Sequence, residues 1–128
     1  MTHYDPDIAP DPADWLALDE DERIQLAEAH HRAARIKLPN AKVHAVFHAI
    51  VENQTAEGIE PIVLAMARLQ GEGPSRHDAL HAIGSVSAGQ FFEAMKSTVP
   101  DDASVTQARY NAAVERLTAK SWREEYGS

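Results

Sequence analysis

Histidine is the residue type in this chain whose number and spacing most directly suggest chemistry. The 128 residues include seven histidines and no cysteine. Four of the histidines form two pairs with four-residue spacing, His44 with His48 and His77 with His81. An α-helix turns by about 100° per residue, so the two members of such a pair lie on one helix face. Two ring nitrogens on one face are well placed to bind a first-row transition metal.

Glu52 continues the spacing of the first pair, because it follows His48 by four residues. A carboxylate in register with two imidazoles can hold one ion or bridge two. We therefore predict one metal site shared by two helices. Its predicted ligands are His44, His48, Glu52, His77 and His81. The ion expected is zinc or iron, and a catalytic site would use metal-bound water, with Asp78 or Glu52 as its base.

Other residues near these motifs receive simpler interpretations. His31 falls on the apolar stripe of the preceding helix and is an optional further ligand, whereas His30 lies off that stripe and is expected to face solvent. Arg76 is expected to be a solvated residue in the first turn of its helix, with pairing to Glu52 or Asp78 as the alternative. Phe91 and Phe92 are expected to lie in the core.

A second hypothesis needs no metal. The four paired histidines would then hydrogen-bond to one another, to Glu52 and to Gln54 as a buried polar network. The protein would be a non-enzymatic interaction module or a homodimer, and the small residues at 84–89 would form a packing seam.

The histidine pattern resembles an uncharacterised bacterial family of small helical proteins, classed as a domain of unknown function. In that family, a helix with two histidines at this spacing is followed by Glu and Gln, and then by a second such helix. The matching residues are His44, His48, Glu52, Gln54, His77 and His81, within about residues 40–95. The resemblance implies an all-α fold and a metal site.

Two further resemblances are partial. His48 with Glu52, and His77 with His81, are similar to two ligand pairs of hemerythrin-like bundles, and His31 would stand for their first-helix histidine. No histidine follows His81, so the di-iron ligand set is incomplete. The segment from His77 to His81 also resembles the H-E-x-x-H motif of metalloproteases. There Asp78 replaces the glutamate base, and peptidase activity is not expected.

The helices that must position these residues are predicted from capping signals and apolar spacing. A short helical turn over residues 13–18 is expected to bury Trp15 and Leu18. Longer helices are predicted over residues 19–38, 40–56, 61–71, 75–97 and about 101–126. The chain shows no sustained alternation of apolar and polar residues. We therefore expect an all-α, antiparallel bundle of about five helices.

Specific signals set the predicted helix ends. Asp19 with Glu22 forms a capping-box pattern, Asn40 and Ser75 are favourable N-caps, and Gly58 is a stop. Residues 1–12 are predicted to be an extended lead-in, and residues 13–128 to form a single helical domain.

Composition excludes several classes of function. The 12 basic residues against 20 acidic ones give a net charge of −8, which argues against nucleic-acid binding. The lack of cysteine excludes disulfides, thiolate zinc sites and thiol nucleophiles. No long apolar run or secretory signal is present, so a cytoplasmic protein without membrane contact is expected. Neither a phosphate-binding glycine loop nor a G-x-S-x-G motif occurs.

Overall fold

The computed structural model describes residues 1–33, 41–96 and 102–126, and these residues form helices and no strand. The helices are α1 Pro12–Ala17, α2 Glu20–Ala33, α3 Ala41–Ala56, α4 Glu60–Gly71, α5 Arg76–Lys96, α6 Ala103–Arg116 and α7 Ala119–Tyr126. The predicted all-α class is confirmed. Among the described residues, no helix is both long enough and apolar enough to cross a membrane.

Local sequence signals set several helix ends as predicted. The Asp19 carboxylate accepts a hydrogen bond from the Glu22 amide at 2.8 Å, and Glu22 accepts one from the Asp19 amide. Ser75 accepts from the Asp78 amide at the start of α5. Gly58 ends the α3 segment with a φ of 71°. The predicted cap Asn40 and the predicted end of the first long helix lie outside the described residues.

The predicted helix over residues 101–126 is instead two helices, α6 and α7. Leu117 adopts an extended backbone and is buried, so the chain turns there. Thr118 then begins α7, because its hydroxyl accepts from the Ser121 amide while the Ser121 hydroxyl accepts from the Thr118 amide. The reciprocal T-x-x-S pattern is a capping box that the sequence prediction missed.

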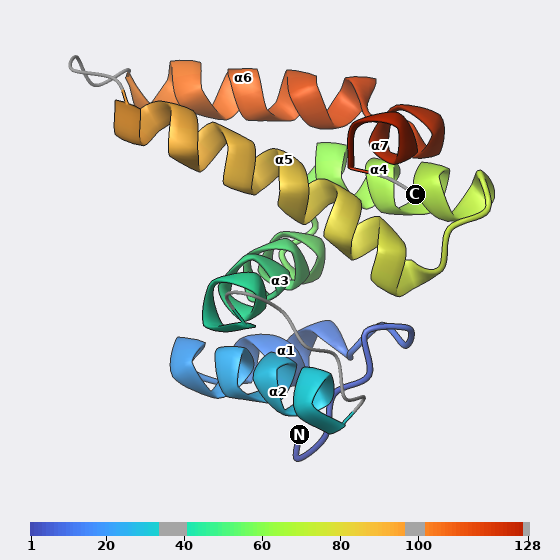
Figure 1. The fold of residues 1–128 in the computed structure, drawn as a ribbon. Coiled ribbons are helices and arrows are strands. Elements are labelled where there is room, and N and C mark those ends of the chain that lie inside the picture. The colour runs from blue at the N-terminus through green and yellow to red at the C-terminus, as the bar shows by residue number, and fades with distance from the viewer. Residues whose placement is uncertain (34–40, 97–101, 127–128) are drawn as a thin grey trace.

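Helix α3 lies at the centre of the fold and packs against α1, α2, α4 and α5 (Figure 1). Two groups of buried apolar residues flank it. One joins α3 to α1 and α2 and includes Trp15, Ala27 and Ala49. The other joins α3 to α4, α5 and α6, around Val51 and Leu69. The polar residues of α3 therefore lie between two cores.

The far end of α5 runs beyond this body beside α6, in the opposite direction (Figure 1). Phe91 and Phe92 lie on this end and are 53% and 50% exposed. The prediction that they belong to the core is wrong, because this end of α5 projects beyond both cores. Phe91 still packs edge-on against Phe47 of α3, with ring centroids 6.0 Å apart.

Residues 1–11 contain no helix or strand, and the Ile8 amide closes a turn by donating to the Asp5 carbonyl at 3.0 Å. The segment is nevertheless packed into the protein, since Tyr4 and Pro6 are buried. Its contacts reach α3 and α5, which carry the paired histidines.

Candidate metal centre

Helices α3 and α5 bring the two histidine pairs to one place. We refer to His44, His48, His77 and His81 as the histidine cluster. Its ring centroids are 4.4 Å apart for His44 and His81, and 4.3 Å apart for His77 and His81. The ring of His48 lies 5.2 Å from that of His77 and 5.6 Å from that of His81. Each helix contributes one face, as the four-residue spacing requires.

Three members of the cluster can hold a metal ion. His48, His77 and His81 each offer a ring nitrogen, and these nitrogens lie within 4.8 Å of one another. The ligand nitrogens of a tetrahedral zinc site lie about 3.3 Å apart. Modest side-chain rotations would therefore bring the three nitrogens to one ion.

His44 lies beside this group. Its Nε2 atom is 2.9 Å from Nε2 of His81, which joins α3 to α5. This separation matches a hydrogen bond between two neutral imidazoles, and it is also close to that of two ligands on one metal. The structure thus places all four histidines of the predicted ligand set together.

The cluster is partly shielded from solvent, since His44, His77 and His81 are half-buried. His48 is 3% exposed, and its Nε2 atom and that of His77 are both buried. His77 is the second residue of α5, where the positive end of the helix dipole disfavours a protonated imidazole. Burial and position both favour the neutral form, which is the form that binds metal.

Glu52 lies on the same face of α3 but has other partners. Its two carboxylate oxygens accept hydrogen bonds from the Arg76 guanidinium at 2.7 and 2.8 Å. Both side chains are buried, with Glu52 1% and Arg76 9% exposed. Glu52 is not among the three residues whose ligand atoms gather at the cluster. The expectation that Arg76 is solvated is wrong, because α5 begins against the buried face of α3.

Tyr4 connects this ion pair to the cluster. Its hydroxyl donates to Oε2 of Glu52 and lies 3.0 Å from Nδ1 of His48. Burial, reinforced by the nearby negative charge of Glu52, raises the pKa of the Tyr4 hydroxyl well above its ordinary value. Tyr4 therefore keeps its proton. No sequence pattern predicted these contacts, because Tyr4 is 44 positions from His48 and 48 positions from Glu52.

Two more groups of the lead-in reach α5. The carbonyl oxygen of Pro6 accepts from Arg76 at 2.9 Å. The Asp7 carboxylate accepts from the backbone amide of His77 at 3.0 Å. The first turn of α5 is therefore held both by its own Ser75 and by a residue 70 positions earlier.

His30 also lies at the edge of the cluster. Its ring packs edge-on against that of His77, with centroids 5.5 Å apart, and the residue is half-buried. The expectation that His30 faces solvent is wrong, because α2 turns the face containing Ala27 and His30 towards the protein interior. The side chain of His31 lies outside the described residues, so its optional ligand role stays a prediction.

Gln54 and Asn53 of α3 have partners away from the cluster. Gln54 accepts a hydrogen bond from the Tyr110 hydroxyl of α6. Asn53 accepts from Trp15 and from Arg23. These two residues brace neighbouring helices, whereas Asp78 is exposed on α5.

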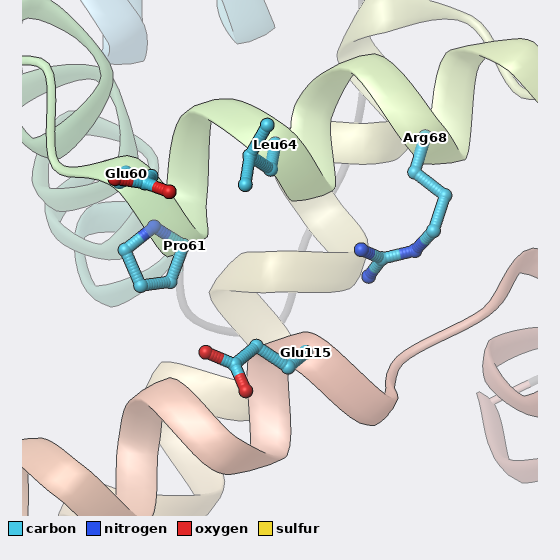
Figure 2. A pocket seen from close by; sticks show the side chains of 5 residues that line it. All are labelled: Glu60, Pro61, Leu64, Arg68 and Glu115. Atoms are coloured by element: carbon cyan, nitrogen blue, oxygen red, sulfur yellow. The ribbon is translucent and has the colours of Figure 1, made fainter.

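A separate cavity of about 350 Å³ lies between α4 and α6 and is lined by Glu60, Pro61, Leu64, Arg68 and Glu115 (Figure 2). The Arg68 guanidinium points towards the space between the helices, opposite Glu115 (Figure 2). Its Nη2 donates to the carbonyl oxygens of Val114 and Leu117. Arg68 therefore satisfies the end of α6, and none of the paired histidines lines this cavity.

Comparison of the chain with protein-family models, with curated proteins and with solved structures found no match.

Proposed function

We propose that this protein binds one divalent transition-metal ion in the histidine cluster. The observation that carries the proposal is the approach of three ring nitrogens, from His48, His77 and His81, to within 4.8 Å of one another. They come from two helices and from a partly buried site. Metal binding would therefore tie α3 to α5 between the two cores.

Zinc is the ion that this donor set favours. The cluster offers neutral imidazoles alone, and the nearby carboxylate of Glu52 is held by Arg76 in a two-point ion pair. Non-haem iron centres commonly combine two histidines with a carboxylate, whereas zinc accepts nitrogen ligands in a tetrahedral arrangement. An iron site would require Glu52 to leave Arg76.

His44 would decide whether the ion keeps an open position. With His44 as the fourth ligand, the site would have four imidazoles and the closed character of a structural zinc site. With three ligands, a water molecule would complete the coordination and could act as a nucleophile. His44 lies 2.9 Å from His81 and is the nearby imidazole that could take the fourth position, although its nitrogen is not among the three that gather within 4.8 Å of one another.

The same separation also supports a metal-free alternative. A hydrogen bond between His44 and His81, together with the contact from Tyr4 to His48, would form the buried network without an ion. The two functions differ in their metal content, which a direct measurement separates.

The test uses the full chain purified without a histidine tag. We expect one equivalent of zinc by mass spectrometry and a rise in thermal stability that a chelator reverses. His48→Ala and His81→Ala should each abolish the bound metal, because they share one ion. His44→Ala should keep the metal but bind it more weakly.

His3→Ala is the matched control, since His3 is exposed and lies outside the cluster; it should bind zinc like the wild type. A wild-type protein that takes up no zinc, and whose stability is unchanged by chelator, would establish the hydrogen-bonded network instead.

We also propose that a second copy of this chain binds the end of α5. The exposed apolar side chains there are Phe91, Phe92 and Met95, all between 50% and 67% exposed. Residues 79–92 contain no Asp, Glu, Lys or Arg, although the whole chain carries a charge of −8. The charged residues at the same end of α5, Glu93 and Lys96, pair with each other at 3.8 Å. Two acidic copies repel each other elsewhere, so this apolar face is where they can meet.

A further inference from the structure

We propose that residues 4–7, called the N-terminal segment below, position two histidines for the metal, and that Tyr4 sets which nitrogen of His48 faces the ion. The inference rests on the proposed metal site. It assigns a role to part of the chain that contributes no ligand itself.

The first step is the position of the single hydroxyl proton of Tyr4. The hydroxyl donates to Oε2 of Glu52. Glu52 can only accept there, because its carboxylate is paired at both oxygens with the Arg76 guanidinium. A tyrosine hydroxyl has one proton to give, so towards His48 it can only accept.

The second step follows for His48. If the Tyr4 oxygen accepts at 3.0 Å, Nδ1 of His48 must carry the hydrogen. The neutral ring has one protonated nitrogen, so its lone pair is then on Nε2. His48 would thus present Nε2 to a metal, and this atom is buried within the protein.

The third step concerns the strength of the ligand. Ligand histidines commonly donate their other ring hydrogen to a carboxylate, a backbone carbonyl or a water molecule. This hydrogen bond orients the ring and increases its basicity. Here the path runs from His48 through Tyr4 to Glu52. The tyrosine ring also packs edge-on against that of His48, with centroids 5.6 Å apart, so it restrains the ring in two ways.

The same segment holds the second helix. Asp7 accepts from the backbone amide of His77, and Pro6 accepts from Arg76. The segment therefore contacts α5 at His77, and through Tyr4 it contacts α3 at His48. It therefore spans the two helices whose separation the metal would fix.

The experiment compares Tyr4→Phe with Tyr110→Phe in the full chain. Tyr110 is a matched control, because its buried hydroxyl also makes two side-chain hydrogen bonds, to Gln54 and Ser87, away from the cluster. Zinc affinity is measured by competition with a chelator of known affinity. We expect Tyr4→Phe to weaken zinc binding about 10- to 100-fold and Tyr110→Phe to leave it unchanged.

A second measurement does not involve the metal. Nitrogen NMR of the metal-free wild type should show His48 with its hydrogen on Nδ1, and Tyr4→Phe should shift the ring towards the other tautomer. Equal zinc affinity in the wild type and Tyr4→Phe, or an Nδ1 without hydrogen in the metal-free wild type, would overturn the role of Tyr4. Failure of the wild type to bind zinc would overturn the metal site, while the NMR result would still report on the contact.

Discussion

At the scale of single residues, the main feature is a buried ion pair whose two members also form hydrogen bonds with the N-terminal segment. Glu52 and Arg76 share two hydrogen bonds. Glu52 accepts a further one from Tyr4, and Arg76 donates a further one to the carbonyl oxygen of Pro6. Removing one member of such a pair leaves the other charged and buried, which is costly. The pair therefore fixes the orientation of α5 against α3 before any metal binds.

Glu52→Gln should lower the free energy of unfolding of the metal-free protein by about 3–5 kcal/mol. The substitution keeps the size of the side chain but leaves Arg76 buried without a counter-charge. Urea unfolding in the presence of chelator measures the change.

The control for this prediction is Glu93→Gln, which removes an exposed pair with Lys96 at 3.8 Å. Its effect should stay below about 1 kcal/mol, because solvent screens such pairs. A Glu52→Gln protein within that same range would show that the buried pair contributes little.

At the scale of elements, helix ends depend on both local and distant groups. The α3 segment ends through Gly58, whose positive φ permits the Ile59 amide to donate to the Gln54 carbonyl at 3.0 Å. The end of α6 instead uses Arg68 of α4, and the start of α7 uses Glu72, which accepts from the Ala119 amide. The first kind of end is visible in sequence, whereas the second requires α4 to be in place.

Gly58→Ala should destabilise the protein by about 1–2 kcal/mol, because an L-residue is strained at a φ of 71°. Gly71→Ala is the comparison, since Gly71 is the last residue of α4 and nothing lies within 4 Å of the added methyl group. That variant should be unchanged or more stable by up to about 1 kcal/mol. Equal losses in the two variants would contradict a conformational role for Gly58.

At the scale of the whole molecule, α3 separates two apolar cores and presents its polar face between them. This arrangement buries the histidine cluster without requiring it to replace core packing. It also leaves the end of α5 outside both cores (Figure 1). Among the described residues, the polar histidine cluster thus lies between the cores, whereas the apolar end of α5 lies outside them.

Sedimentation equilibrium should give a mass twice the 14.1 kDa of one chain, because the exposed apolar face is proposed to bind its own copy. Phe92→Glu combined with Met95→Glu should return the protein to a monomer. Leu64→Glu serves as the control, since Leu64 is 55% exposed on α4 and should leave the dimer intact. A monomeric wild type at high concentration would exclude self-association and leave the face to a different protein.

Much of the site was predictable because it depends on local periodicity. The spacing of His44 with His48, and of His77 with His81, fixes their shared faces once the helices form. The sequence also suggested that two such faces meet, and the ring contacts agree. The burial of side chains on α2 and at the far end of α5 was harder to predict. The rotation of α2, and the length of α5 that extends beyond the two cores, depend on packing between helices. His30 and Phe92 were misplaced for that reason.

Local sequence patterns were enough to predict the all-α class, most of the described helix ends and the four histidines that share two helix faces. These features follow from backbone hydrogen bonding and side-chain spacing within a few residues. The partners of Glu52 and the place of Tyr4, which is 44 positions from His48, depend instead on how distant segments pack together. A carboxylate in register with histidines can bind a metal or a guanidinium. The choice depends on which buried charge the fold brings beside it, and here that charge is Arg76.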